Sequence, residues 1–378
     1  MYDVAILGAG PAGTTCALAL HAAGVRVVLL DKDTFPRDKI CGDAIPGRSF
    51  KVMRSIRPEW EEELFALRQR ATIRSARVVA PNLKDFTLDW EQRAYNSPRL
   101  DFDNHLFGMV GRHTDTEIRQ GFYARGIERT AEGITLTATD GTSVSAKLLI
   151  ACDGANSVVA RKLDPQPLDR RHHAAAVRAY VRGVRGLRED TNEVITVEKF
   201  LPGYLWIFPV GEGLANVGFG MLSERVKATG MNLRAALLEV IHEHPDFRDR
   251  FAGAEIVGEV TGFGLPFGSQ LRPLAGNRYL LAGDAGALID PMAGHGIDKA
   301  MLSGKIAAGW AARALAADRY EADFLRGYER EVYAALAGEF RRNHLAMRFL
   351  AGKPWLINWG VGLARNDTLK GLLRKVAY

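Results

Sequence analysis

Two mostly hydrophobic runs, at residues 2–7 and 25–30, lie on either side of an Ala- and Leu-rich segment at the start of the chain, and each contains one charged residue near its start. Short continuous apolar runs are typical of strands buried on both faces, and the segment between them, residues 11–23, predicts a helix. A further apolar run follows at 279–282. The order strand, glycine turn, helix, strand predicts the start of a parallel α/β sheet.

Elsewhere apolar and polar residues alternate, as they do in half-buried strands. The alternation covers about residues 73–88 and much of 172–260, and Asp140-Gly141 predicts a hairpin turn within 133–150. These segments predict antiparallel insertions between the pieces of the parallel sheet. Helical spacing predicts helices at 59–70, 97–125, 233–244, 300–316 and 328–349.

The first apolar run leads directly into a GxGxxG turn at residues 8–13. In such a turn Gly8 allows the tight bend, because glycine tolerates unusual backbone angles. Gly10 lets backbone amides approach a pyrophosphate, and Gly13 lets the helix pack closely on the strand. The turn therefore predicts a dinucleotide site, and the same geometry suits NAD and FAD.

Residues on both sides of this turn support the same interpretation. Pro11 and Ala12 begin the helix, whose N-terminal end carries partial positive charge that favours an anion. Asp31, followed by Lys32, ends the second strand, where a carboxylate accepts hydrogen bonds from ribose hydroxyls.

Two later strand-to-helix turns decide between NAD and FAD. Gly283-Asp284 ends the apolar run 279–282, which places Asp284 to hold a ribityl hydroxyl. The backbone amides of Gly294, Gly296 and Ile297 come at a helix start, where they would face an electron-rich flavin edge. Both features favour FAD.

Asp153 and Arg99 lie in two further turns next to a strand end or a helix start. Asp153 precedes Gly154 after an apolar strand, and Arg99 stands just before a helix, where it would pair with a phosphate or close over the flavin. Each feature alone is typical of ordinary structure. Their order along the chain, GxGxxG, Arg-x-x-Phe-Asp, Asp-Gly, Gly-Asp, is much more specific.

Composition narrows the class of protein. The 50 Lys and Arg against 44 Asp and Glu give a net charge of +6 that is scattered along the chain. This argues against nucleic acid as a partner and suits an anionic cofactor, an anionic substrate or an acidic membrane surface. Cys16, Cys41 and Cys152 are far apart, which argues against a disulfide scaffold, a zinc site or a dithiol flavoenzyme.

The N-terminal residues and the apolar runs bear on location. Met1 is followed by an apolar strand without a basic or cleavable leader pattern, and no run of 18 apolar residues occurs. We therefore expect a cytoplasmic protein.

At this point the chain resembles the FAD-dependent hydroxylases, halogenases and reductases of the glutathione-reductase-like FAD fold. Within that class it is most similar to the geranylgeranyl reductase family. The matching segments are PRDKICGD at 36–43, YLWIFP at 204–209, NVGFG at 216–220 and the Gly283-Asp284 corner. The resemblance covers nearly the whole chain.

The resemblance implies reduction of C=C bonds of an isoprenoid or prenylated lipid, with hydride from reduced FAD. It implies an α/β fold in which a Rossmann-like FAD-binding domain is interleaved with a smaller α+β antiparallel-sheet substrate domain, followed by a C-terminal helical segment. The ranges expected are 1–70, 98–165 and 274–330 for FAD, 71–97 and 166–273 for substrate, and 331–378 for the helical segment.

Site residues follow from the motifs and from the resemblance together. The residues expected to hold non-covalent FAD are Gly8, Gly10, Pro11, Ala12, Gly13, Asp31, Lys32, Arg37, Cys41, Gly42, Asp43, Arg99, Asp153, Gly283, Asp284, Gly294, Gly296 and Ile297. The residues expected to act in catalysis are Cys41, Tyr204, Trp206 and His295. NAD(P)H or ferredoxin would supply electrons transiently, since the sequence has a single complete GxGxxG motif. No metal is expected.

Two of these residues keep alternative interpretations. Cys41 is either a proton donor or a small residue that lets the flavin come close. His295 replaces the carboxylate that the family commonly carries in its last flavin loop, and it either faces solvent or serves as a proton source.

The C-terminal segment is apolar through residues 349–364, with Trp355 and Trp359 four residues apart and basic residues nearby. Such a segment is typical of an interfacial helix, and a lid packed on the substrate domain fits equally well. We expect residues 349–378 to contact the inner face of a membrane, and the protein to be a monomer.

Three rival functions stay open. A flavin monooxygenase would share the fold and transfer oxygen to an aromatic ring. A flavin halogenase fits less well, because residues 203–209 only partly match its tryptophan motif and no catalytic lysine is apparent. A flavin-containing lipid carrier would perform no chemistry.

Overall fold

The computed structural model describes residues 1–68, 70–90 and 92–365. Its first sheet has the order β17-β18-β11-β1-β2-β8, with a hairpin of β9 and β10 attached to β11. The pairs β8–β2, β2–β1, β1–β11 and β11–β18 are parallel, and β17 is antiparallel. The strands are β1 (Tyr2–Leu7), β2 (Val27–Leu30), β8 (Glu117–Arg119), β9 (Ala124–Arg129), β10 (Ile134–Ala138), β11 (Ser143–Ala151), β17 (Ala275–Gly276) and β18 (Tyr279–Leu281).

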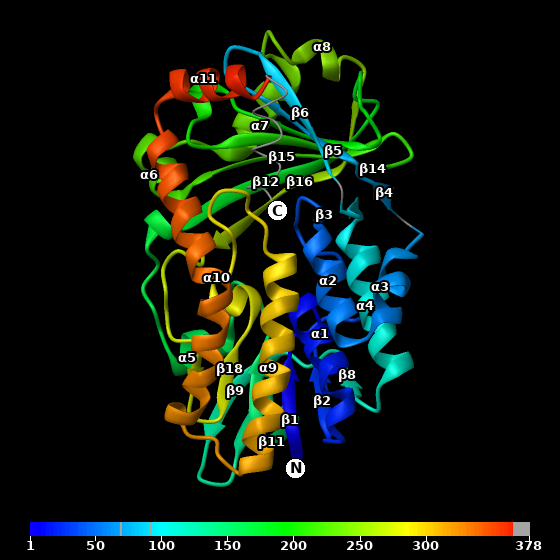
Figure 1. Ribbon diagram of the computed structural model, residues 1–378, viewed down its shortest axis with the longest axis vertical. Coiled ribbons are helices and arrows are strands. Elements are labelled where there is room, and N and C mark those ends of the chain that lie inside the picture. The colour runs from blue at the N-terminus through cyan, green and yellow to red at the C-terminus, as the bar shows by residue number, and fades with distance from the viewer. Residues whose placement is uncertain (69, 91, 366–378) are drawn as a thin grey trace.

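The alternating side chains of β1 enter two different cores. Val4 and Ile6 pack with helices α1 (Pro11–Leu20), α4 (Arg99–His113) and α9 (Ile297–Ala317), whereas Ala5 and Leu7 pack toward the β9–β10 hairpin and α5 (Val158–Leu163). Burial on both faces explains why residues 4–7 of the strand are all apolar. Figure 1 shows α1 and α9 side by side over the sheet.

The second sheet has seven strands in the order β16-β12-β15-β14-β13-β5-β6. All neighbours are antiparallel except β13 and β5, whose parallel pairing the alternation alone does not predict. Helices α7 (Leu233–His242) and α8 (Arg248–Phe251) pack on one face. The strands are β5 (Ser75–Val79), β6 (Asp85–Asp89), β12 (His173–Arg182), β13 (Thr191–Ile195), β14 (Tyr204–Gly211), β15 (Leu214–Leu222) and β16 (Glu255–Pro266).

The remaining elements join the two sheets. Figure 1 shows the long helix α10 (Ala322–Leu350) running beside both sheets, and α11 (Pro354–Ala364) packs against β6. A small sheet, β3 (Ala44–Ile45), β7 (Tyr95–Asn96) and β4 (Ala71–Thr72), lies between them. The other helices are α2 (Gly47–Ile56), α3 (Pro58–Phe65) and α6 (Ser223–Thr229), and the short 3-10 turns are η1 (His21–Ala23), η2 (Arg170–His172), η3 (Glu198–Phe200) and η4 (Gly283–Gly286).

The expected fold class is confirmed, and one expected element is wrong. The helix predicted over 97–125 ends at His113, and the rest of that segment forms β8 and the start of β9. Thr114, whose hydroxyl bonds the Val110 carbonyl, has extended backbone angles that end the helix. The strand β8 is only three residues long and lies at the sheet edge, so it left little periodic pattern. The exact domain boundaries stay a prediction.

Candidate functional site

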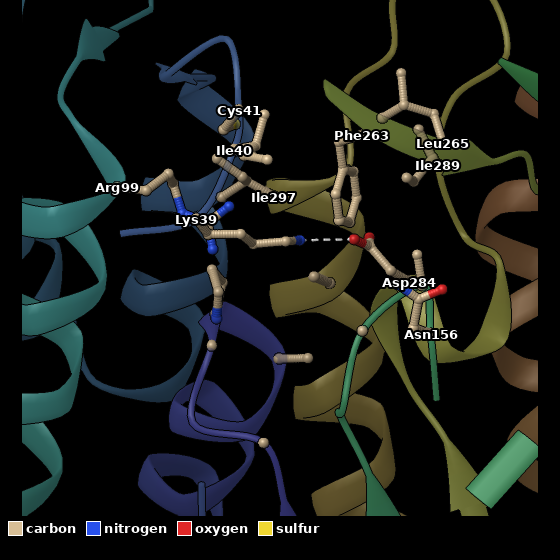
Figure 2. A pocket seen from close by; sticks show the side chains of 18 of the residues that line it. Lys39, Ile40, Cys41, Arg99, Asn156, Phe263, Leu265, Asp284, Ile289 and Ile297 are labelled. Atoms are coloured by element: carbon tan, nitrogen blue, oxygen red, sulfur yellow. Dashed lines mark hydrogen bonds and ion pairs between the residues drawn. The ribbon is translucent and has the colours of Figure 1, made fainter. Parts of the chain in front are cut away.

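A cavity of about 540 Å³ lies where the carboxyl ends of the parallel strands face the seven-stranded sheet. Figure 2 shows part of its lining, which comes from β16, from the helices α4 and α9 and from the segments between them. The structure brings almost all of the expected site residues to this one cavity. Those that line it are Gly8, Gly10, Pro11, Ala12, Asp31, Lys32, Arg37, Cys41, Gly42, Asp43, Arg99, Asp153, Tyr204, Trp206, Asp284, Gly294, His295, Gly296 and Ile297, whereas Gly13 and Gly283 lie behind it.

The three glycines of the turn differ in what surrounds them. A Cβ on Gly8, where φ is +101°, would lie 2.3 Å from the Cys152 carbonyl oxygen. A Cβ on Gly13 would lie 1.9 Å from the Gly8 carbonyl oxygen, so both positions are closed by backbone. Beside Gly10 the nearest atom would be Arg37 Nη2, at 3.6 Å. The turn is therefore tightly packed behind and open toward the cavity, as close approach of a ligand requires.

Asp31 is fixed to the turn rather than pointing freely into the cavity. The Ala9 N–H donates to Asp31 Oδ2 at 2.6 Å and the Asp33 N–H donates to Oδ1 at 2.9 Å. Burial raises the pKa of Asp31, while these two N–H groups favour the charged form. The carboxylate keeps lone pairs that ribose hydroxyls would share.

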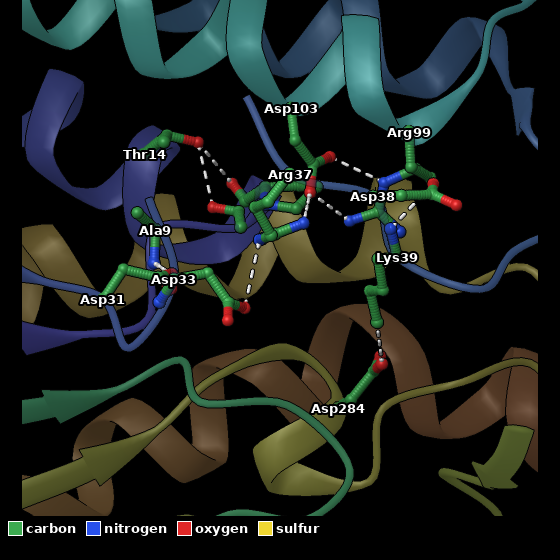
Figure 3. A network of polar contacts seen from close by, with 12 residues as sticks. Ala9, Thr14, Asp31, Asp33, Arg37, Asp38, Lys39, Arg99, Asp103 and Asp284 are labelled. Atoms are coloured by element: carbon green, nitrogen blue, oxygen red, sulfur yellow. Dashed lines mark hydrogen bonds and ion pairs between the residues drawn. The ribbon is translucent and has the colours of Figure 1, made fainter. Parts of the chain in front are cut away.

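A buried cluster of charges supports the same end of the cavity (Figure 3). Arg99 Nε and Nη2 donate to the two oxygens of Asp103 at 2.6 and 2.7 Å, and Arg37 Nη1 donates to Asp103 Oδ2 at 2.6 Å. Burial alone would raise the pKa of Asp103, but the two guanidinium groups hold it below its usual range. The expected Arg99 thus pairs with a carboxylate of its own helix.

Lys39 reaches across the cavity to Asp284. Its Nζ lies 2.8 Å from Asp284 Oδ2 and 5.1 Å from the centre of the Phe263 ring. Figure 2 shows the Lys39 side chain extended toward Asp284. The ribityl-binding role expected for Asp284 therefore requires Lys39 to share or release this carboxylate.

Cys41 lies half-buried at the cavity wall. Its side chain accepts a hydrogen bond from the Asp43 N–H and is also a hydrogen-bond partner of the Arg99 side chain. Burial raises the pKa of the Cys41 thiol, against the effect of the Arg99 charge. All three cysteines are free, and within the described part of the chain no group of His, Cys, Asp or Glu is arranged to hold a metal ion.

The opposite wall is aromatic and apolar. Trp206 donates through Nε1 to Asn216 Oδ1 at 2.9 Å, and Tyr204 donates through its hydroxyl to the Ala293 carbonyl at 2.8 Å. A Cβ on Gly218 would lie 2.0 Å from the Trp206 ring, so this glycine provides the space in which the indole lies. The other apolar residues of this wall are Ala176, Val177, Phe208, Phe263, Leu265 and Ile289.

His295 lies in the loop that leads into α9 and lines the cavity. The Asp290 N–H donates to the His295 carbonyl at 3.0 Å, which holds the loop in place. Burial lowers the pKa of His295, against the raising effect of Asp298, so the imidazole is neutral at pH 7. A neutral imidazole has one donor and one acceptor nitrogen.

Sequence reasoning missed several residues of the site. Lys39 and Asp103 belong to quoted motifs but were not expected to act. Only the fold reveals that Lys39 pairs with Asp284, whereas Asp103 follows Arg99 by four residues on one helix, a spacing that could have indicated their pairing. Phe263 and Leu265 lie on β16, in an alternating strand that resembles any other.

The fold and the cavity define a class, the proteins that carry an FAD-binding domain. The family model "FAD binding domain" matches residues 1–213, and the model "Geranylgeranyl reductase catalytic domain" matches residues 175–260. The chain belongs to the geranylgeranyl reductase family of FAD-dependent oxidoreductases.

Similar proteins from bacteria and archaea agree with this assignment. A menaquinone reductase of Mycobacterium tuberculosis is 30% identical over 81% of this chain and 75% of its own length. A digeranylgeranylglycerophospholipid reductase of Methanopyrus kandleri is 30% identical over 87% of this chain and 81% of its own length.

Solved structures share the fold. A geranylgeranyl bacteriochlorophyll reductase-like protein of Thermoplasma acidophilum superposes with a TM-score of 0.83 at 24% identity, over 96% of this chain and 90% of that one. A flavin-dependent brominase superposes with a TM-score of 0.80 at 20% identity, over 99% and 92% of the two chains.

The residues present fit FAD. The open side of Gly10 leaves room for a pyrophosphate, and Asp153 Oδ1 is a buried acceptor without a hydrogen-bond partner among the described residues. Both features are what a nucleotide cofactor would use. The protein is therefore an FAD-dependent oxidoreductase.

Proposed function

We propose that this protein reduces C=C bonds of an isoprenoid or prenylated lipid. The observation that carries the proposal is the aromatic wall, with Trp206 in the space left by Gly218, in the same cavity as the dinucleotide turn. A prenyl chain has no polar handle, so an apolar channel must bind and orient it. The names of the relatives, which include reductases of menaquinone and of digeranylgeranylglycerophospholipid, support the same substrate class.

Different residues of the cavity would bind the cofactor, orient the substrate and supply the proton. Bound FAD would supply the hydride. The glycine turn, Asp31 and the Arg37–Asp103–Arg99 cluster would hold the cofactor, and Tyr204 and Trp206 would orient the alkene. The Cys41 thiol, kept protonated by its burial, would hold the proton that completes the reduction. His295, which is neutral at pH 7 and lines the same cavity, would relay a proton through its one donor and one acceptor nitrogen.

The electron donor belongs to the same proposal. NAD(P)H would bind transiently, or a ferredoxin would deliver electrons, because the sequence contains one complete GxGxxG motif and FAD takes it. We propose a monomer as the working unit.

Anaerobic reduction of the bound FAD, followed by addition of a geranylgeranyl lipid or menaquinone, tests the function. The expected result is reoxidation of the flavin with a product two hydrogens heavier than the substrate. Reoxidation only in oxygen, with a product one oxygen heavier, would show a monooxygenase instead. Flavin that binds but is never reoxidised by any alkene would show a lipid carrier.

We also propose that the C-terminal segment contacts a membrane. Trp355 and Trp359 are 64% and 63% exposed on α11, and Leu345 and Phe349 are exposed at the end of α10. Helix α11 packs on β6 by its other face, and the Asn82 N–H donates to Asn358 Oδ1 at 3.0 Å. Aromatic residues at the surface with basic neighbours suit an anionic lipid interface. Residues 366–378 of the expected contact lie outside the described residues.

Flotation with phosphatidylglycerol vesicles tests this contact. The double variant Trp355→Ser/Trp359→Ser is expected to lose most vesicle binding, because it removes the two most exposed aromatic side chains among the described residues. Tyr123→Ser, which removes an aromatic side chain that is 57% exposed at the loop before β9, is the matched control. Equal binding by all three proteins would contradict the contact.

No helix of the described residues is long and apolar enough to cross a membrane.

A further inference from the structure

The segment that carries Cys41 is fixed by a fully buried acid two residues later. Asp43 is 0% exposed and has φ of +64°, a left-handed conformation that is uncommon for residues other than glycine, although Asn, Asp and His adopt it more often than the rest. Such backbone persists only where surrounding contacts hold it. Asp43 therefore occupies a position that the fold maintains at some cost.

The contacts that hold Asp43 come from the substrate-side sheet. The Tyr180 hydroxyl donates to Asp43 Oδ2 at 2.7 Å, and Asn216 Nδ2 donates to the same oxygen at 2.8 Å. Asn216 Nδ2 also donates to the Cys41 carbonyl at 2.8 Å, and its Oδ1 accepts from Trp206 Nε1. One network thus joins the carboxylate, the Cys41 backbone and the aromatic wall.

The second oxygen of Asp43 has no such support. Asp43 Oδ1 is buried without a hydrogen-bond partner among the described residues, although a buried carboxylate oxygen ordinarily has one. The charge of Asp43 also acts on its neighbours. The nearest of these in the chain is Cys41, whose sulfur accepts the Asp43 N–H.

The charges around Cys41 and Asp43 act in opposite directions on the ionisation of the Cys41 thiol. Arg99 from α4 and Lys39 from the same loop favour the Cys41 thiolate, whereas the Asp43 charge favours the thiol. Asp43 itself faces Tyr180 and Arg178 from β12 and Asp38 from its own loop, where Arg178 pairs with Asp38 at 2.7 Å. Burial raises the pKa of Asp43 to about 6, so the carboxylate is mostly charged at pH 7 and loses its charge below pH 6.

We propose that Asp43 is a positioning residue for Cys41: anchored on Tyr180 and Asn216, its carboxylate fixes the Cys41 segment against the Trp206 wall and keeps Cys41 in the proton-bearing thiol form. This inference rests on the proposed role of Cys41 as the proton holder. A thiol held in this way keeps its proton at neutral pH and is a poor nucleophile.

Alkylation of Cys41 by iodoacetamide, followed from pH 6 to 10 by mass spectrometry of its peptide, tests the proposal in the full-length protein as purified. In Asp43→Asn the Oδ1 of asparagine can take both hydrogen bonds of Oδ2, so the charge is lost and the anchor kept. The variant is expected to react about tenfold faster below the plateau, which corresponds to a fall of about one unit in the thiol pKa. Asp101→Asn, a carboxylate lost from α4, is the matched control and should stay within about twofold of the unchanged protein.

An alkylation profile of Asp43→Asn that superposes on the unchanged protein would overturn the proposal. A changed plateau rate with the same midpoint would also overturn it, because that result reports access to the thiol and not its charge.

If Asp43→Asn does not fold, alkylation of Cys41 in the Tyr180→Phe variant tests the proposal instead. Loss of the hydroxyl raises the Asp43 pKa further, so alkylation should be faster between pH 6 and 7 and unchanged above pH 8. Equal rates throughout would overturn the proposal. Alkylation needs neither FAD nor lipid, so its outcome is independent of whether the protein reduces the proposed substrate.

Discussion

The two ends of the cavity are built in opposite ways. The dinucleotide end comes from a turn, the next strand end and one nearby helix, and its charges are held in short ion pairs such as Arg99 with Asp103. The aromatic end comes from β12, β14 and β16 of the seven-stranded sheet, and it is held by packing and a few hydrogen bonds. The first end depends on backbone geometry and buried charge, and the second depends on shape.

The difference explains what each end can tolerate. Backbone that fills the space around Gly8 and Gly13 cannot move aside, whereas side chains of an aromatic wall can repack within limits. Changes at the dinucleotide end should therefore abolish folding or FAD binding. Changes at the aromatic end should alter only the binding and turnover of the substrate. The predictions below test this separation.

The largest effect is expected for Gly13→Ala. The new Cβ would meet the Gly8 carbonyl oxygen at 1.9 Å, and no side-chain rotation relieves a clash with backbone. We expect loss of more than about 4 kcal/mol in the free energy of unfolding, or no soluble protein. Gly111→Ala, in the same kind of helical setting with no atom within 4 Å, should gain up to about 1 kcal/mol. Urea denaturation compares them, and similar stabilities would contradict the packing argument.

Gly10→Ala separates the cofactor from the fold within the same turn. Its Cβ would meet only Arg37 Nη2, at 3.6 Å, so the protein should fold normally. The methyl group points to the open side where a pyrophosphate would approach, so the Kd for FAD should rise by at least about tenfold, or about 1.4 kcal/mol. Flavin fluorescence titration measures this, and an unchanged Kd would place the pyrophosphate elsewhere.

Arg99→Met tests the buried charges of the dinucleotide end. It leaves Asp103 with Arg37 alone, and breaking a buried ion pair costs about 3–5 kcal/mol. The double variant Arg99→Met/Asp103→Leu removes the stranded charge and should recover part of that loss. If the single variant proves as stable as the unchanged protein, the ion pair does not support the site.

The two ends also differ in how far the sequence predicted them. The spacing of Gly8, Gly10, Gly13 and Asp31 follows from the chemistry of one turn, and it predicted the position of that end within the fold. Lys39 with Asp284 and Asn216 with Asp43 are partners across more than a hundred residues, so only the folded chain brings them together. The strand β8 was missed for the related reason that three residues at a sheet edge have almost no periodicity.

The buried Asp43 lies between the two ends and predicts a pH dependence of stability. Its pKa is raised to about 6 by burial, from 3.8, so between these values the folded protein binds more protons than the unfolded chain. The contribution of Asp43 to stability should therefore fall by up to about 3 kcal/mol as the pH rises from about 4 to above 6.

Asp43→Asn removes this titration and should flatten the pH profile by the same amount. Asp323→Asn, an exposed acid on α10, should leave the profile within about 0.5 kcal/mol. Urea denaturation at pH 4.5 and pH 7 of all three proteins measures the difference. Parallel profiles for Asp43→Asn and the unchanged protein would mean that Asp43 titrates in its ordinary range.

The sharpest test of the aromatic end is expected for Gly218→Ala. Its Cβ would lie 2.0 Å from the Trp206 ring, so the indole must shift, which costs about 1–3 kcal/mol of stability. Gly220→Ala is the matched control on the same strand, because its Cβ would be at ordinary contact distance, 3.5 Å from Ala176 and 3.6 Å from Trp206.

These two glycine variants should bind FAD alike and differ in turnover. Displacing Trp206 changes the shape of the wall that would orient the alkene, so kcat/KM for lipid reduction should fall at least about tenfold in Gly218→Ala only. If Gly218→Ala instead loses FAD, the two ends of the cavity are coupled through the Trp206–Asn216–Asp43 network and do not act separately.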